Sequence, residues 1–447
     1  MIPILNGIEA GRAHIARARA LEDKGLDPKM AERIRNLFGA DLTPDQAVAR
    51  ILADVAARGE AACREWTKRI DGVELARLRV SPDEIDAAYQ ETPVAVREAL
   101  HRSADRIRAF HDKQKPRSWV DWAPDGSALG QLIQPLARVG VYVPGGTAPL
   151  PSSLLMSAIP AQVAGVAEIV VATPPGRDGR VAPVILAAAR TAGVDQVLTL
   201  GGAQAIAALA YGTENLPRVD KIVGAGGLFT TLAKRQVYGR VGIDGLYGPT
   251  ETLLIADDSA NPAWVAADLL AQAEHDVLAT SILITPSQTL ADAVKQAIGK
   301  QAAALSRRAI VEQSLAGQGA IIVIESLEQA LELSNAFAPE HLCLLVREPW
   351  EWVPRVRNAG GIFVGEWSSE ALGDYVLGPS HVMPTAGTAR FGSPLNVNDF
   401  CKITSILHVP PALSQSLAQS ARILAESEGL TAHANAAIIR GAPDKEQ

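Results

Sequence analysis

The sequence reads Ala167-Glu-Ile-Val-Val-Ala-Thr173, then Gln196-Val-Leu-Thr-Leu200 and then Asp220-Lys-Ile-Val223, with a helical stretch between successive runs. Short apolar runs rich in Val and Ile are typical of strands that are buried on both faces. Strands that alternate with helices form βαβ units, whose strands lie parallel in one sheet. This stretch therefore predicts an α/β fold built on a parallel sheet.

The same alternation continues through the second half of the chain. Four further runs predict buried strands, at residues 252–256, 281–285, 319–324 and 342–346. The two sets of strands occupy residues 135–250 and 252–365. Because a chain of 447 residues exceeds what one hydrophobic core usually supports, we expect two αβα sandwiches.

The two ends of the chain lack this alternation. Residues 1–115 have the mixed charges and heptad-like apolar spacing of helices, and Asp41 or Thr43 can cap a helix that begins at Pro44. After residue 390 we expect no further strands, because helical signals resume over residues 411–426. We therefore predict helical extensions at both ends, the second packing on its own lobe or on a partner subunit.

Composition excludes several classes of protein. The apolar share is 48% and the net charge is −7 with scattered basic residues, which gives no basic face for nucleic acid and no basic anchor for membranes. No apolar window approaches the roughly 20 residues that span a bilayer. The three cysteines show no Cys-x-x-Cys spacing, and the first residues lack the features of a signal peptide. We expect a cytoplasmic protein that acts on a small molecule.

The helix predicted over residues 261–275 carries a pair of candidate metal ligands. Asn261 and Pro262 mark its start, and Gln272 and His275 are three residues apart near its end, so both project from one face. An amide oxygen and a neutral imidazole suit a divalent metal, and Asp268, one turn earlier, could brace them. Taken alone, the pair is more typical of a polar helix end with a solvated glutamine and a capping histidine.

A carboxylate and an imidazole stand side by side at Glu340 and His341, at the entrance of a predicted strand. Pro339 ends the preceding helix, because the residue before a proline is disfavoured in helical conformation. One of the two groups can hold a proton while the other takes one from a substrate. The alternative is a polar turn without chemistry.

Two other segments offer similar groups on loops. Asp374 and His381 lie in a loop punctuated by Gly and Pro, and Glu428 and His433 lie close together near the C-terminus. Such loops present side chains at fixed angles, but they also simply connect elements. On their own these segments leave both interpretations open.

Signals for a nucleotide cofactor are modest. The run Gly224-Ala-Gly-Gly227 follows a strand but lacks the third glycine of the dinucleotide fingerprint. The run Val141-Tyr-Val-Pro-Gly-Gly146 and the run Gly201-Gly-Ala-Gln204 could bring backbone amides to a phosphate or a ribose, although ordinary tight turns look the same.

Taken together, these segments resemble the histidinol dehydrogenase family, zinc-containing and nicotinamide-dependent enzymes of histidine biosynthesis. The resemblance spans roughly residues 40–440 in collinear order. Besides the candidate site segments, it rests on Ala148-Pro-Leu-Pro-Ser-Ser-Leu-Leu-Met156, Leu200-Gly-Gly-Ala-Gln-Ala-Ile-Ala-Ala-Leu-Ala-Tyr-Gly-Thr213, Val241-Gly-Ile-Asp244, Glu370-Ala-Leu-Gly-Asp374 and Pro384-Thr-Ala-Gly-Thr-Ala-Arg-Phe391.

The resemblance implies a role for each candidate residue. Zinc is expected on Gln272, His275, Asp374 and His433, the last reaching across from the partner subunit of a homodimer. Glu340 and His341 match the acid–base pair. The matching substrate contacts are Thr250, His381 and Glu428 together with His341 and the zinc ligands, and the NAD contacts are Tyr142, Gln204 and position 227.

The implied fold is a domain-swapped homodimer of chains with two incomplete Rossmann-like αβα lobes. The expected divisions are an N-terminal helical arm (1–40), a first α/β lobe (41–130 with 251–390), a second lobe on the cofactor side (131–250) and a C-terminal helical tail (391–447) that contributes to the partner's site.

The chain departs from the family pattern at three positions, which bear on substrate and cofactor affinity. Gly227 stands where the family has Asn, Thr250 where it has Ser, and Asn398 where an aromatic residue is expected. The leading hypothesis is oxidation of L-histidinol through histidinal to L-histidine. The alternatives are a related dehydrogenase of another small polar alcohol, such as a sulfonated diol or an amino alcohol, and an inactive paralogue that binds a metabolite. The ligand set would also accept manganese or cobalt.

Overall fold

The computed structural model describes residues 2–19, 28–145 and 149–440. Gly146 and Ala148 of the quoted runs and the end of the C-terminal tail lie outside these residues. The described chain forms two compact units, residues 1–114 with 136–400 and residues 115–135 with 401–447. The predicted α/β class with parallel strands is confirmed in the first unit.

The first unit contains a six-stranded parallel sheet in the order β1-β11-β10-β9-β12-β13. Its strands are β1 (Ile4–Asn6), β9 (Glu251–Ala256), β10 (Thr280–Thr285), β11 (Ala320–Val323), β12 (His341–Leu345) and β13 (Gly361–Val364). The central strands are fully buried, as expected for parallel strands covered on both faces.

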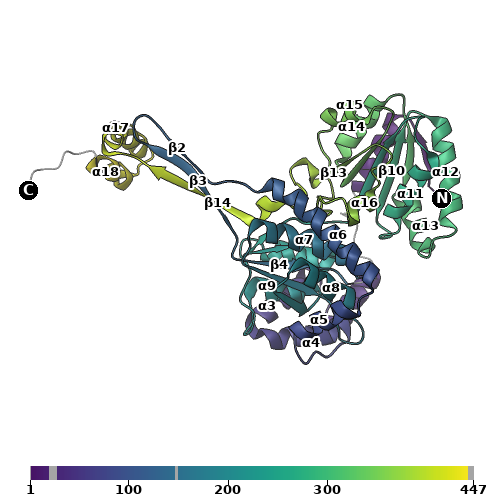
Figure 1. The fold of residues 1–447 in the computed structure, drawn as a ribbon, viewed down its shortest axis with the longest axis horizontal. Coiled ribbons are helices and arrows are strands. Elements are labelled where there is room, and N and C mark those ends of the chain that lie inside the picture. The colour runs from purple at the N-terminus through teal and green to yellow at the C-terminus, as the bar shows by residue number, and fades with distance from the viewer. Residues whose placement is uncertain (1, 20–27, 146–148, 441–447) are drawn as a thin grey trace, which may run out of the picture. The chain divides into compact units, whose positions relative to one another are not determined.

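Helices cover both faces of this sheet (Figure 1). One face packs on α11 (Pro262–Ala273), α12 (Gln288–Ala302) and α13 (Arg308–Gly317), and the other on α1 (Ile8–Arg19) and α14 (Leu327–Phe337). The short helices α15 (Pro349–Trp352) and α16 (Glu370–Tyr375) follow β12 and β13. The described chain then forms the 3-10 turns η3 (Val353–Arg355), η4 (Thr388–Arg390) and η5 (Val397–Phe400), of which η5 packs on α7 (Pro151–Ala164) of the other half.

The first unit also contains a five-stranded parallel sheet in the order β6-β5-β4-β7-β8. Its strands are β4 (Arg138–Tyr142), β5 (Glu168–Thr173), β6 (Gln196–Thr199), β7 (Lys221–Val223) and β8 (Gly242–Ile243). Helices α9 (Gly202–Tyr211) and α10 (Leu228–Val237) pack in one core cluster with strand residues such as Val170 and Ile222. Helices α7 (Pro151–Ala164) and α8 (Pro183–Ala192) complete the βαβ connections.

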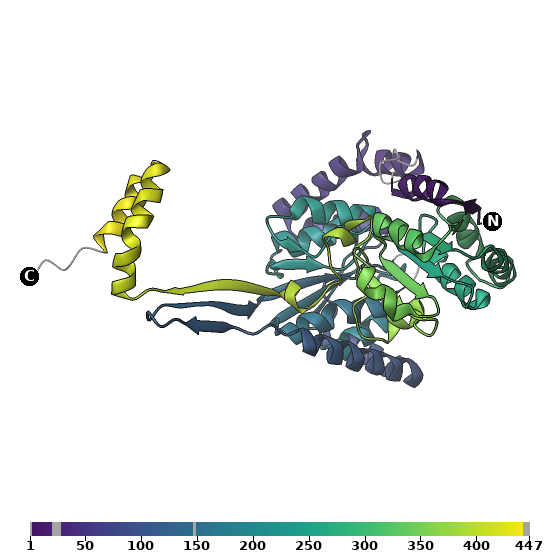
Figure 2. The same ribbon diagram turned by 90° about the horizontal axis from the view of Figure 1, so that it is seen from above.

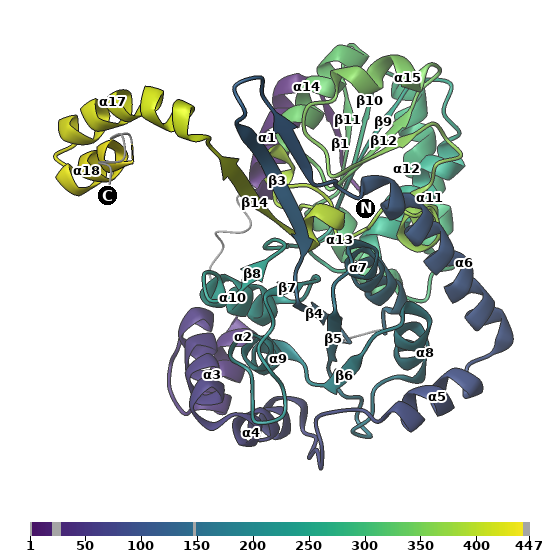
Figure 3. The same cartoon turned by 60° about the vertical axis from the view of Figure 1, so that its left-hand side comes forward.

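The N-terminal helices that follow α1 pack mainly on the five-stranded half. They are α2 (Pro28–Phe38), α3 (Pro44–Arg58), α4 (Glu60–Asp71), α5 (Pro82–Glu91) and α6 (Val94–His111), followed by the turn η2 (Asp112–Gln114). Helices α3 and α4 lie beside α9, and α5 and α6 lie against α8 and α7 (Figure 3). This differs from the expected grouping of residues 41–130 with 251–390, because the apolar faces of α3 and α4 share one core with α9 and α10.

Helix α3 begins at Pro44 as its sequence predicts, and of the two candidate caps the structure uses Thr43 and not Asp41. Thr43 and Gln46 form a capping box, in which the Thr43 hydroxyl accepts from the Gln46 amide at 3.2 Å and the Gln46 side chain accepts from the Thr43 amide at 2.9 Å. Pro44 occupies the first turn, where its missing N–H costs nothing.

Up to residue 440, the second unit consists of three antiparallel strands and two helices. Its strands β2 (Trp119–Trp122), β3 (Ala128–Pro135) and β14 (Cys401–His408) form a narrow ribbon, and helices α17 (Pro411–Ser427) and α18 (Thr431–Ile439) pack on each other (Figure 2). The expectation of no strand after residue 390 is wrong, because β14 pairs along its whole length with β3. Its side chains are mostly exposed, so it carries no buried apolar run that the sequence could signal.

Within the described ranges, no helix combines the length and the apolar character needed to cross a membrane.

Candidate active site

The amino ends of two neighbouring strands, β9 and β12, form the floor of the candidate site. These strands pair in register, with His341 opposite Thr252, so Glu340 and His341 lie beside Thr250 and Glu251. Ligands of open α/β sheets usually bind at the carboxyl ends of the strands, so this site lies at the opposite edge of its sheet. Helix α11 returns from the carboxyl end of β9, which places its C-terminal residues at the same amino edge.

Glu340 is buried at this edge and is held by two hydrogen bonds. The Thr250 hydroxyl donates to Glu340 Oε2 at 2.5 Å, and the Glu251 amide donates to the same oxygen at 3.0 Å. Burial raises the pKa of Glu340 to about 7, although the nearby imidazole and both hydrogen bonds favour the charged form. A carboxyl group of this kind can either hold or release a proton near neutral pH.

The ring of His341 is fixed by one of its nitrogens. Its Nδ1 donates to the Glu251 carbonyl at 3.1 Å, which leaves Nε2 as the atom that can exchange a proton. Nε2 is buried without a hydrogen-bond partner in the described structure and lies 4.0 Å from Asp374 Oδ1. Burial lowers the pKa of this imidazole, but three nearby carboxylates outweigh burial and raise its pKa to about 9. They belong to Glu340, Glu370 and Asp374.

Gln272 and His275 project from the end of α11, as the spacing predicts. The helix starts as expected, with the Asn261 side chain accepting from the Ala263 amide at 2.9 Å. The buried Gln272 donates from Nε2 to Thr250 Oγ1 at 2.7 Å, so its Oε1 atom is left for another partner. His275 Nδ1 bonds the Ala271 carbonyl at 3.0 Å, which leaves Nε2 for a metal.

Asp374 and His381 lie close to this group of residues. The carboxylate of Asp374 is 3.7 Å from His381 Nδ1, which also bonds the Asp374 carbonyl at 2.9 Å. The other ring nitrogen of His381 bonds the Ser153 hydroxyl on α7 at 3.1 Å. Burial lowers the pKa of His381 and favours its neutral form. Ser153 belongs to one of the quoted runs, but its place beside His381 could not be read from the sequence.

Two further acidic residues each lie one helical turn before a candidate ligand, Asp268 before Gln272 and Glu370 before Asp374. Glu370 is buried and accepts from Thr252 Oγ1 and, at 3.1 Å, from Cys343 Sγ. Burial raises the pKa of Glu370. Burial, and then the charge of Glu370, raises the pKa of Asp268 to about 7. The expected bracing of Gln272 by Asp268 is replaced in the structure by the bond from Gln272 to Thr250.

The donor atoms at the amino edge fit a divalent metal chemically but form an incomplete set. Gln272 Oε1, His275 Nε2 and the Asp374 carboxylate are the oxygen and nitrogen ligands that zinc accepts. In the part of the chain that the structure describes, no three His, Cys, Asp or Glu side chains come together to hold a metal ion. A metal site at this edge therefore requires the Gln272 amide oxygen and one further ligand from a residue outside this group.

Glu428 and His433, the remaining predicted site residues, belong to the second unit. Glu428 follows α17 and His433 lies on α18, and both are exposed. Asn398, the third departure from the family pattern, is exposed in η5, where its amide donates to Asn396 Oδ1 at 3.0 Å.

The predicted cofactor residues gather at the carboxyl edge of the five-stranded sheet. Strand order reverses between β4 and β7, and this is the position where open α/β sheets bind nucleotides. Tyr142 ends β4, and its hydroxyl accepts from the Gly202 amide at the start of α9 at 3.0 Å. Gln204 is fully buried on α9, with Oε1 unpartnered in the described structure. Gly227 is the N-cap of α10, and a Cβ there would meet no atom within 4 Å.

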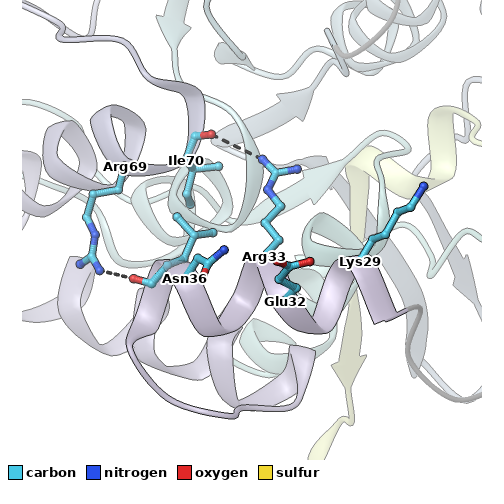
Figure 4. Close-up of a pocket in the computed structure, with 7 residues that line it drawn as sticks. Lys29, Glu32, Arg33, Asn36, Arg69 and Ile70 are labelled. Atoms are coloured by element: carbon cyan, nitrogen blue, oxygen red, sulfur yellow. Dashed lines mark hydrogen bonds between the residues drawn. The ribbon is translucent and has the colours of Figure 1, made fainter.

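A cavity of about 370 Å³ lies elsewhere, between α2 and α4, and contains none of the predicted site residues (Figure 4). Its lining is formed by Lys29, Glu32, Arg33, Asn36, Leu37, Arg69 and Ile70.

Comparison with known proteins identifies the family. A family model described as histidinol dehydrogenase matches residues 40–441. The chain belongs to the histidinol dehydrogenase family. A curated histidinol dehydrogenase of Deinococcus radiodurans is 52% identical over 97% of this chain and 99% of its own, and one of Moorella thermoacetica is 49% identical over 98% and 100%.

A solved structure agrees with this assignment. The crystal structure of histidinol dehydrogenase from Elizabethkingia anophelis, at 32% sequence identity, has a TM-score of 0.89 and covers 98% of both chains. Identity of about one half over nearly the full length shows that the chain is an oxidoreductase of this family and not a divergent member. The comparisons give no support to another alcohol as substrate or to an inactive paralogue.

The Asp268–Glu370 pair makes stability depend on pH in a defined direction. Because the pKa of Asp268 in the folded protein is raised to about 7, its ionisation disfavours the folded state as pH rises from about 4 through 7. We expect Asp268→Asn, which cannot ionise, to gain thermal stability relative to the unsubstituted metal-free protein between pH 5 and 8. Melting temperatures across this range measure the effect, with exposed Asp292→Asn as the control. If the difference in melting temperature between Asp268→Asn and the unsubstituted protein stays constant with pH, Asp268 does not have the raised pKa.

Proposed function

We propose that the protein oxidises L-histidinol through L-histidinal to L-histidine with NAD as the hydride acceptor. The observation that carries the proposal is the buried Glu340–His341 pair, whose free His341 Nε2 lies beside Asp374 and among the candidate ligands. Family membership at about 50% identity supports the same reaction.

Proton handling in the two steps follows from the hydrogen bonds of the pair. His341 Nε2 takes the hydroxyl proton as the alcohol loses its hydride, because its Nδ1 is already committed to the Glu251 carbonyl. Glu340 then draws a proton from the water that adds to the aldehyde, since a carboxyl group with a pKa near 7 can exchange protons at neutral pH. Loss of the second hydride from the hydrate gives the carboxylate.

The residues around the pair orient the substrate. When bound, zinc on Gln272, His275, Asp374 and His433 of the partner subunit would fix the substrate's nitrogen ligands and offset carboxylate charge near His341. Tyr142, Gln204 and Gly227 would hold two NAD molecules in succession, each of which would accept one hydride. His381 and Glu428 would contact the substrate, and the Thr250 hydroxyl keeps Glu340 and Gln272 in place as a serine would.

We also propose that the active unit is a homodimer whose C-terminal tails complete each other's sites. In the second unit, the only buried residues in the described part are Ala128, Gly130, Ala418, Ala425 and Ala434. Large apolar side chains there are exposed, Trp122 by 69%, Leu407 by 74% and Leu424 by 65%. A unit with so little core requires apolar cover from outside itself, and a second copy of the chain supplies it.

The two-step reaction predicts a fixed ratio of NADH formed to L-histidinol consumed. The purified protein with zinc and excess NAD should form two NADH for each L-histidinol consumed, with L-histidine as product, and a chelator should abolish the reaction. Absorbance of NADH and amino-acid analysis measure this. NADH from a panel of amino alcohols and sulfonated diols, with none from histidinol, would contradict the proposed substrate.

The base assignment predicts the effect of one substitution. His341→Asn should lower kcat by roughly 10²–10⁴, because general-base catalysis by a positioned side chain contributes that much. Zinc content by mass spectrometry should stay at the level of the unsubstituted protein, since His341 is not among the proposed ligands. His101→Asn, the same change at an exposed histidine, serves as the control. Near-normal turnover of His341→Asn would show that another group takes the proton.

Sharing of sites between subunits predicts complementation. His341→Asn impairs the body of one chain, and His433→Ala impairs the tail of the other. A heterodimer of these two chains should recover about half of the normal activity. One of its two sites combines the unsubstituted His341 of one chain with the unsubstituted His433 of the other. Heterodimers isolated with two different affinity tags allow this measurement. Activity no higher than in the parent homodimers would mean that each tail serves its own chain.

A further inference from the structure

A buried ion pair lies beside residues 224–227, which we call the cofactor loop. It has no role in the proposed proton transfers. Lys234 on α10 and Asp244 after β8 are 2.5 Å apart, with side chains 2% and 1% exposed. Burying two charges costs several kcal/mol of desolvation per ion, and apolar replacements of such pairs are often as stable. Stability alone therefore does not account for an ion pair at this position.

Both members of the pair bind the same residue of the cofactor loop, Gly224. Lys234 Nζ donates to the Gly224 carbonyl at 2.9 Å, and Asp244 Oδ2 accepts from the Gly224 amide at 2.7 Å. Gly224 has a φ of 105°, and a Cβ there would lie 2.2 Å from the Tyr142 carbonyl oxygen. The loop is thus pressed against the end of β4 on one side and held by two opposite charges on the other.

The pair also holds the start of the segment that leads to the acid–base residues. We call residues 245–250 the connector. Asp244 Oδ1 accepts from the Gly245 amide at 2.8 Å, and its carboxylate also bonds the Tyr247 side chain. Lys234 Nζ lies 4.9 Å from the centre of the Tyr247 ring.

The far end of the connector reaches the catalytic edge of the other sheet. Thr250 donates to Glu340 and accepts from Gln272. The Gly248 amide donates to Thr385 Oγ1 at 2.7 Å, which fixes the connector between these two ends. The ion pair therefore lies where the cofactor loop and the route to the acid–base pair meet.

We propose that Lys234 and Asp244 are positioning residues, which fix the Gly224–Gly227 loop relative to the connector so that NAD is held in register with Glu340 and His341. The proposal rests on the proposed function. Because Gly227 has no side chain, this loop offers a dinucleotide mainly backbone groups, whose direction depends on how the Gly224 peptide is held. An apolar pair of similar size could fill the space but could not hold both the N–H and the C=O of Gly224.

The test replaces the pair without leaving a lone buried charge. In Lys234→Met with Asp244→Leu the fold should persist, because both charges are removed together. The dissociation constant for NAD, measured by calorimetry, should rise at least about tenfold, since two or more hydrogen bonds to the loop are lost. Zinc content should not change, and KM for NAD should rise much more than KM for histidinol.

A second ion pair in the same half of the molecule provides the control. Lys221 and Asp399 lie 3.0 Å apart and are 14% and 25% exposed, and neither bonds Gly224 or the connector in the described structure. Lys221→Met with Asp399→Leu should leave NAD affinity within about twofold. If the first double variant does not fold, Thr231→Val removes only a hydroxyl that bonds the Gly226 and Tyr247 carbonyls. One such bond is worth about 1 kcal/mol, so it should weaken NAD binding about fivefold.

The outcomes separate this inference from the proposed function. Absence of NAD binding by the unsubstituted protein would overturn the proposed function. Normal NAD affinity in a folded Lys234→Met, Asp244→Leu variant, or in Thr231→Val if the double variant does not fold, would overturn only the positioning role. Equal loss of affinity in the Lys221–Asp399 control would overturn it too, because the effect would then be general to ion pairs of this half.

Discussion

The arrangement of the site depends on one buried carboxylate at the junction of two parallel strands. Glu340 is the residue that precedes β12, yet its hydrogen bonds come from Thr250 and Glu251 at the start of β9. These bonds fix the amino ends of the two strands against each other and bring His341 to the Glu251 carbonyl. The same hydroxyl of Thr250 holds Gln272. One threonine thus connects the proposed acid–base pair to the helix that carries the proposed ligands Gln272 and His275.

The position of this junction follows from how the two sheets are connected. The carboxyl edge of the five-stranded sheet carries the residues expected to contact the cofactor, and the amino edge of the six-stranded sheet carries the proposed acid–base pair. Only residues 244–250 separate the end of β8 from the start of β9, a span of at most about 25 Å at 3.3–3.6 Å per residue. The short link keeps the two edges within reach of one substrate, whichever chain supplies the C-terminal tail.

The sequence predicted those features that local chemistry controls. Buried strands such as 252–256 and 342–346 carry continuous apolar runs, so their burial was visible without a structure. The cap at Thr43 and the shared face of Gln272 and His275 follow from spacing along one helix. The placement of Glu340 beside His341 at the entrance of a strand could be predicted because the two residues are adjacent in the chain. The role of Gly227 and the zinc set came from the family resemblance and remain proposals.

Features that depend on distant partners could not be predicted in the same way. Strand β14 is defined by its pairing with β3, some 270 positions earlier in the chain, and has no apolar run of its own. The contact of Ser153 with His381 joins α7 to a loop far along the chain. Likewise, the Lys234–Asp244 pair lies within an ordinary helix and an ordinary turn, and only folding brings both to Gly224.

The most direct measurement is a crystal structure of the protein with zinc, histidinol and NAD bound together. We expect the substrate hydroxyl oxygen at about 2.6–3.2 Å from His341 Nε2, the reach of a proton-transferring hydrogen bond. We also expect the Glu340 carboxyl group on the same side of the reacting carbon. A hydroxyl oxygen beyond hydrogen-bond reach of both groups, with no bridging water, would show that this buried pair does not move the protons.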